Sequence, residues 1–145
     1  MVLLKRLLLW TICSQALIVI AMAHGVGVMF FMDLFAIIDF RNFIKEENFS
    51  LIPKPFYEGI GIAIVLSVIG KVLAIVALFI KKQRLFFILS FTALASLWLS
   101  FFYLSHDLDH NNSLYAALIS GLPFLGLFIL FVVFAFLHIK NVKAV

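Results

Sequence analysis

Long apolar runs separated by short polar segments dominate the hydropathy pattern of the chain. A helix needs about 20 predominantly apolar residues to cross a bilayer, with all its backbone hydrogen bonds made internally. Four runs reach that length: residues 7–32, 59–80, 85–104 and 114–139. The first run could continue as far as Ile38. The pattern therefore predicts an all-α integral membrane protein with four transmembrane helices.

The connections between the runs set the predicted topology. The second and third runs are joined by residues 81–84, and the third and fourth by residues 105–113. Such short connections place neighbouring helices antiparallel. We therefore expect one transmembrane domain, residues 1–145, folded as an up-down-up-down bundle of four helices.

The first connection, residues 33–58, is longer and has a pattern of its own. Between Leu34 and Lys45, apolar and polar residues alternate with roughly helical spacing. Pro53 and Pro55 then interrupt the chain before the second run. We expect an amphipathic helix at the membrane interface in this connection, with a plain extramembrane loop as the alternative.

The composition supports residence in a membrane. Apolar residues make up 66% of the chain and charged residues 12%, whereas soluble domains are nearer one half and one quarter. A soluble fold of this length could not bury so much apolar surface. The single cysteine, Cys13, excludes an intrachain disulfide and a cysteine-based metal cluster.

The charges are distributed unequally between the two sides of the predicted membrane. One side carries basic residues without acids, namely Lys5, Arg6, Lys81, Lys82, Arg84, Lys140 and Lys143. The other side or its border carries all the acids, namely Asp33, Asp39, Glu46, Glu47, Glu58, Asp107 and Asp109. The positive-inside rule then predicts cytoplasmic termini, and we expect the bacterial inner membrane as the location. This rule explains the net charge of +4 without a nucleic-acid partner.

The first run also has features of a signal peptide. Lys5 and Arg6 precede an apolar stretch, and Ala21-Met22-Ala23 matches a cleavage site. However, the apolar run continues through Gly25 to Met32, well beyond that site. We therefore interpret the first run as a membrane span, with cleavage before His24 as the alternative.

Lys71 is the most informative residue of the sequence, because it lies near the middle of the second run. A charge at that depth costs about 2.5–3.5 kcal/mol on insertion scales. Lys71 lies on the same face of the predicted helix as a stripe of small residues. Membrane helices pack closely along such stripes. The stripe comprises Ala63, Ser67, Gly70, Lys71, Ala74 and Ala77.

We therefore expect Lys71 to face protein, with Gln15, Ser96 and Thr92 at similar depth as its partners. Its role would be an ion or proton relay, or a contact to another subunit. The alternative is a lysine that extends along the helix to the cytoplasmic headgroups.

His24 is another polar residue inside a predicted span. An intramembrane histidine can bind haem or metal, or transfer protons. The remaining histidines, His106, His110 and His138, are not placed to oppose it across a haem. We therefore favour a hydrogen-bonded structural histidine.

The segment His106-Asp107-Leu108-Asp109-His110 is the best metal-site candidate in the sequence. The two histidines are one helical turn apart, and imidazole with carboxylate suits zinc or another divalent ion. Asn111 and Asn112 follow, which is typical of a solvated turn. We expect a polar loop, with a divalent metal held by His106, Asp107, Asp109 and His110 as the alternative, and we predict no other cofactor.

The sequence carries no nucleotide-binding, serine-hydrolase or zinc-protease motif. We therefore expect a non-enzymatic protein that acts by protein–protein interaction, as an accessory subunit of a membrane complex or an immunity-type protein against a membrane toxin. Its partners would be the lipid bilayer and another membrane protein or a second copy. One alternative is a small oligomeric transporter or channel that uses Lys71. A second is a redox or metal-dependent enzyme subunit that uses His24 or the pair His106 and His110.

Overall fold

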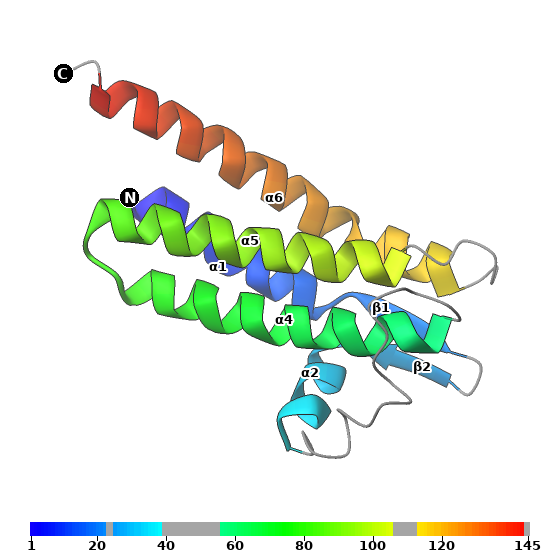
Figure 1. Cartoon of the computed structure of the whole chain (residues 1–145). Coiled ribbons are helices and arrows are strands. Elements are labelled where there is room, and N and C mark those ends of the chain that lie inside the picture. The colour runs from blue at the N-terminus through cyan, green and yellow to red at the C-terminus, as the bar shows by residue number, and fades with distance from the viewer. Residues whose placement is uncertain (23–24, 39–55, 106–112, 144–145) are drawn as a thin grey trace.

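The computed structural model describes residues 1–22, 25–38, 56–105 and 113–143 of the chain. It has three long helices, α4 (Phe56–Phe79), α5 (Gln83–Ser105) and α6 (Ser113–Lys143). Helices α4 and α5 lie side by side, whereas α6 diverges from them toward its C-terminal end (Figure 1). Each contains a stretch long and apolar enough to cross a membrane, and these stretches are Gly61–Phe79, Gln83–Leu104 and Tyr115–Lys140. The second, third and fourth predicted runs are therefore helical.

The first predicted run has a different structure, and the prediction of one helix over residues 7–32 is wrong. Helix α1 (Val2–Ala16) ends early, and strands β1 (Val19–Met22) and β2 (Gly25–Val28) form an antiparallel hairpin. Helix α2 (Met29–Ile38) follows the hairpin directly. Glycines in β2 and β-branched residues in both strands are poor helix formers, which explains the break. In the described residues, α1, the hairpin and α2 stand in place of the expected first spanning helix.

The hairpin is anchored to its neighbours through the backbone at its base. The Val19 N–H donates to Ser120 Oγ of α6 over 2.9 Å, and the Met29 N–H donates to the Ile18 carbonyl over 2.9 Å. Strand β1 packs along α6. Backbone polar groups cannot remain without hydrogen bonds in hydrocarbon. Ser120 of α6 supplies the acceptor that the Val19 N–H of the strand needs.

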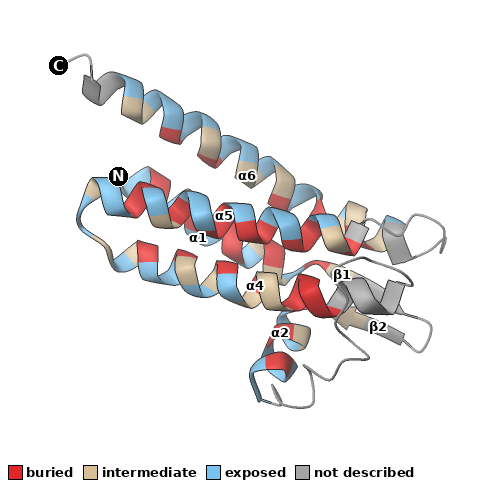
Figure 2. Ribbon diagram, viewed as in Figure 1, coloured by how far each residue is buried: buried red, intermediate tan, exposed pale blue. Residues whose placement is uncertain are grey.

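Two apolar clusters form the core of the bundle, and Figure 2 shows the buried residues on the facing sides of the helices. The cluster near the N-terminus includes Leu8, Phe86 and Phe131. The cluster near the hairpin includes Ile18, Phe101 and Phe124. Polar residues at intermediate positions of α1 and α4 separate the two clusters.

Helices α4 and α5 make the closest helix pair. Ser96 Oγ donates to the Leu66 carbonyl over 2.7 Å, and Ser100 Oγ donates to the Ala63 carbonyl over 2.6 Å. These bonds are made between helices, through serines that lie one turn apart. The small-residue stripe on α4 is buried as predicted, since Ala63, Ser67, Ala74 and Ala77 have no exposed surface.

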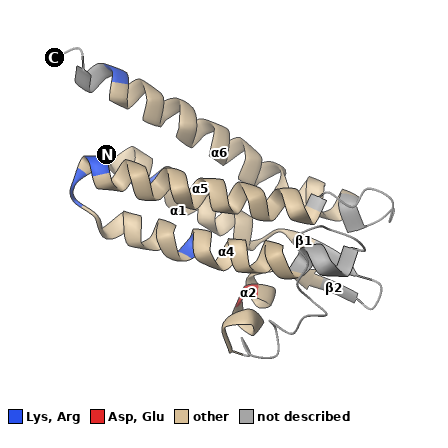
Figure 3. Ribbon diagram, viewed as in Figure 1, with Lys and Arg blue, Asp and Glu red and all other residues tan. Residues whose placement is uncertain are grey.

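Apart from Lys71 in the middle of α4, the basic residues of the described part of the chain gather at the end of the bundle that holds the N-terminus and the α4–α5 connection (Figure 3). One of them has a structural role there: Lys5 Nζ donates to the carbonyls of Leu78 over 2.5 Å and Ile80 over 2.9 Å. Carbonyls in the last turn of a helix lack helical partners, and a cation is favoured near them. Lys5 therefore ties α1 to the C-terminal end of α4.

Replacing Gly70 with alanine should destabilise the bundle by about 1–3 kcal/mol, the usual cost of overpacking. A Cβ at Gly70 would lie 2.7 Å from Leu97 Cγ and 3.0 Å from the Ala93 carbonyl oxygen. Gly126→Ala on α6 is the matched control, because a Cβ there meets nothing within 4 Å. Reversible unfolding in mixed detergent micelles, followed by circular dichroism, measures both. Equal stability of the two variants would contradict the α4–α5 packing.

Candidate functional site

An ion pair joins the middle of α4 to α2. Lys71 Nζ donates to Asp33 Oδ2, and the two side chains are only 13% and 8% exposed. Lys71 lies about 15 Å from Gly61 and about 12 Å from Phe79 along the helix axis, given the rise of an α-helix. Its ammonium group therefore meets a carboxylate within the bundle, instead of extending toward the basic end as the alternative interpretation expected.

Two further buried side chains extend this pair into a network that reaches α1. Ser67 Oγ lies 3.1 Å from Asp33 Oδ2, within reach to donate to it. Gln15 Nε2 donates to Ser67 Oγ over 3.1 Å. Gln15 and Ser67 have no exposed surface at all. Three elements, α1, α2 and α4, thus meet at one polar layer between the two apolar clusters.

One atom of this layer is left without a partner. Asp33 Oδ1 is buried and accepts no hydrogen bond within the described part of the chain. A buried acceptor without a donor costs about 1–3 kcal/mol, and more when it is charged. The carboxylate is therefore satisfied on one side only, by Lys71 and Ser67.

A lateral groove of about 190 Å³ lies beside the ion pair, between α2 and α4. Each helix contributes residues spaced i, i+3, i+4 and i+7, which is one face of a helix. The lining residues are Phe30, Asp33, Leu34 and Ile37 of α2, and Val68, Lys71, Val72 and Ile75 of α4. The exposed surface of the groove is entirely apolar, although Asp33 and Lys71 are among the residues that line it.

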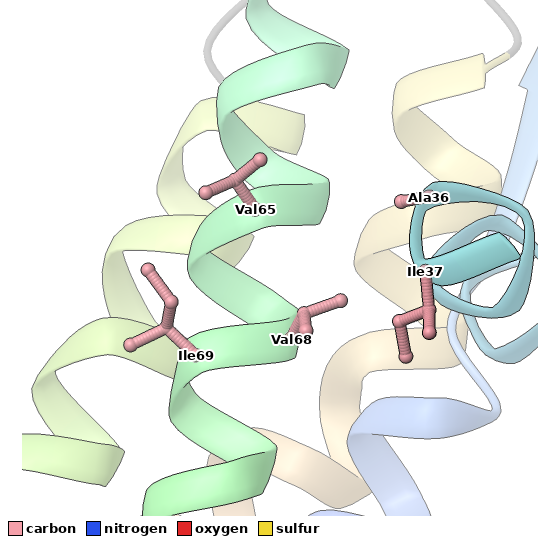
Figure 4. A pocket seen from close by; sticks show the side chains of 5 residues that line it. All are labelled: Ala36, Ile37, Val65, Val68 and Ile69. Atoms are coloured by element: carbon pink, nitrogen blue, oxygen red, sulfur yellow. The ribbon is translucent and has the colours of Figure 1, made fainter. Parts of the chain in front are cut away.

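A second cavity of similar volume lies on the other side of the α2–α4 contact. It is lined by Ala36, Ile37, Val65, Val68 and Ile69 (Figure 4). Figure 4 shows α2 nearly end-on beside α4, with the side chains of Val68 and Ile37 between the two helices. Helix α2 therefore crosses α4 steeply and leaves a hollow on each side.

The structure brings together three of the predicted intramembrane polar residues, namely Lys71, Ser67 and Gln15, although Gln15 reaches Lys71 only through Ser67 and Asp33. The prediction that Ser96 and Thr92 contact Lys71 is wrong. Ser96 donates to the Leu66 carbonyl, and Thr92 Oγ1 donates to the Ile88 carbonyl of its own helix over 2.9 Å. Both of these short side chains on α5 donate their hydroxyl hydrogen to a nearby backbone carbonyl.

The remaining predicted site residues are not placed by the structure. His24 and the four candidate metal ligands, His106, Asp107, Asp109 and His110, lie outside the described residues. Among the described residues, no group of three or more histidines, cysteines and acids could hold a metal ion. The metal alternative therefore stays a prediction from the sequence.

Sequence reasoning missed Asp33, because it was counted with the acids on the far side of the membrane. The sequence does contain a signal for it. Asp33 is the only charged residue between Arg6 and Asp39, with Met29–Met32 before it and Leu34–Ile38 after it. An acid enclosed by apolar residues on both sides predicts a buried carboxylate, and Lys71 is the basic residue in the same setting.

Comparisons with known proteins give no relative: no family model, curated protein or solved structure matches this chain.

Removing either member of the ion pair alone should cost about 3–5 kcal/mol, because the other charge is left buried and unpaired. We expect Asp33→Leu and Lys71→Met each to destabilise the protein, and the double variant to recover most of the loss. Lys82→Met is the control, since Lys82 is exposed in the α4–α5 connection. A double-mutant cycle of unfolding free energies measures the coupling. Additive losses in the cycle would show that the two residues do not interact.

Proposed function

We propose that the protein acts by binding another membrane protein through the α2–α4 face, as an accessory subunit of a membrane complex or an immunity-type protein. The observation that carries this proposal is the lateral groove beside the Asp33–Lys71 pair. The location that we propose is a bacterial inner membrane with both termini in the cytoplasm, from the basic residues at one end of the bundle.

The shape of the groove supports a helical partner. Its two walls are single helix faces with i, i+3, i+4 and i+7 spacing, which is the pattern that a third helix engages in helix-in-groove recognition. Several wall residues are about half exposed: Phe30 52%, Val72 52% and Ile75 47%. A helix seated between them would cover this apolar surface and close the space around the ion pair.

The hairpin gives a second line of support. Val19 bonds to Ser120, which lies within the apolar stretch of α6, so the hairpin begins at membrane depth. Non-helical backbone is tolerated at that depth only where protein or a water-filled cavity covers it. A partner on the side of the bundle that carries the hairpin and α2 would supply such a cover.

A small transporter or channel is the second candidate, because the ion pair lies at mid-depth beside an interrupted spanning segment. Charged pairs within a membrane mark ion and proton pathways in many transporters, and broken segments often form their sites. Against this candidate, the groove beside the pair and the second cavity across the α2–α4 contact are both lateral and have apolar walls. Proton or cation flux into protein-containing liposomes, abolished in the double variant Asp33→Leu/Lys71→Met that recovers the stability, would favour transport over the interaction.

Photo-crosslinking from the groove tests the proposed function. A photoreactive residue at Val72, in the groove wall, should give an adduct with a discrete membrane protein in the cells that express the chain. Leu34, on the opposite wall, should capture the same protein. Val133 on α6 is the matched control, because it is 47% exposed and does not line the groove. Adducts that are equal at Val72 and Val133, or different at Val72 and Leu34, would refute the proposal.

A further inference from the structure

The register of the hairpin determines which backbone groups point away from it. Val19 is paired with Val28, and the Met29 N–H donates to the Ile18 carbonyl at the next position, so that next pair is hydrogen-bonded. Hydrogen-bonded and non-hydrogen-bonded pairs alternate along an antiparallel ladder. The pair of Val19 and Val28 is therefore non-hydrogen-bonded, and so is the pair that contains Val26. The N–H and C=O groups of these residues point away from the neighbouring strand.

The two outer edges of the hairpin differ in what covers them. On β1, the outward Val19 N–H donates to Ser120 Oγ of α6. The edge of β2 faces the opposite way and presents the backbone groups of Val26 and Val28. Neither of these two N–H groups donates a hydrogen bond to another described residue.

The depth of the β2 edge makes a partner necessary. Val28 is opposite Val19, which bonds to Ser120, and Ser120 lies within the apolar stretch of α6. Sheet edges that are open to hydrocarbon are not tolerated, because their N–H and C=O groups have no water to bond. An apolar helix face cannot supply these bonds, since its backbone groups are already used internally. The edge therefore fits another strand.

We propose that the β2 edge pairs with the β2 edge of a second copy of this chain, antiparallel and about a twofold axis at Gly27. The outward residues Val26 and Val28 flank Gly27, so this axis places Val26 of each copy opposite Val28 of the other. Each of these two pairs exchanges both of its N–H···O=C bonds. The two hairpins then form one continuous four-stranded sheet.

The residue at the axis favours a second copy over an unrelated strand. Gly27 would oppose Gly27 of the second copy in a non-hydrogen-bonded pair, where Cα atoms approach to about 4.5 Å. Glycine in a strand allows such a close approach of another backbone. A hairpin alone is only marginally stable, and added strands stabilise it. Twofold pairing of identical surfaces is also the commonest form of protein assembly.

Disulfide crosslinking of the full-length protein in phosphatidylcholine vesicles tests the register of this pairing. In a Cys13→Ser background, Gly27→Cys should give mostly a linked dimer after oxidation, because Cα atoms about 4.5 Å apart suit a disulfide. Val28→Cys is the matched control and should stay mostly monomeric. Its two copies would be diagonal neighbours about 7–8 Å apart, which is too far for a disulfide.

Energy transfer between copies that carry dyes on Cys13, the only cysteine and an exposed one, measures the dimer without a new cysteine. Val26→Pro removes an outward N–H and no bond within the hairpin, and proline is tolerated at sheet edges. We expect it to weaken the dimer about 10–100-fold, through the loss of one bond from each copy. Val26→Ile keeps the N–H and should dimerise like the native chain.

The outcomes are independent of the proposed function, because the β2 edge does not include the residues of the α2–α4 groove. A lack of energy transfer between native copies would overturn the inference, since something other than a second copy then covers the edge. Equal disulfide yields at Gly27→Cys and Val28→Cys, or native dimerisation of Val26→Pro, would also overturn it. If one variant does not fold, the other experiment decides. Loss of the dimer with retained photo-adducts at Val72 would refute this inference and leave the proposed function standing.

Discussion

The ion pair between Lys71 and Asp33 fixes how the first part of the chain packs on the three long helices. Separating the two residues in an apolar interior would leave two uncompensated charges, each costing several kcal/mol. Helix α2 is therefore held across α4, although most of its own large side chains are exposed. Ser67 and Gln15 connect the same carboxylate to α1, so one polar layer sets the positions of three elements.

The groove follows from this constraint. A short helix held across a long one at a single level cannot cover the long helix above and below the crossing. The two cavities beside Ile37 and Val68 are those uncovered places. Asp33, whose Oδ1 has no hydrogen-bond partner in the described residues, lines the cavity beside the ion pair. The packing of α2 on α4 therefore also shapes the groove that we propose for a partner. The function proposed here thus uses the same contact that the fold requires.

The long helices could be predicted from the sequence, because apolar length alone identifies a membrane-spanning helix. The structure of the first run could not be predicted, since a uniformly apolar segment has no periodicity that distinguishes a strand from a helix. Gly25 and Gly27, with the β-branched residues around them, were the local signs of the hairpin. The inward orientation of Lys71 followed correctly from its small-residue stripe. Its partner was missed because Asp33 was assigned to the outer side by sequence position, and only the reversal of the chain at the hairpin returns it to the level of Lys71.

The order of the two charges along the chain has a consequence for biogenesis. Asp33 precedes Lys71 by 38 residues, so a chain that enters the membrane as it is made carries the acid before its base exists. At about 5–20 residues per second, that interval lasts roughly 2–8 s. During it, α2 has no counter-charge to hold it at its final depth. The segment from the hairpin to α2 can therefore settle only after the middle of α4 has been synthesised.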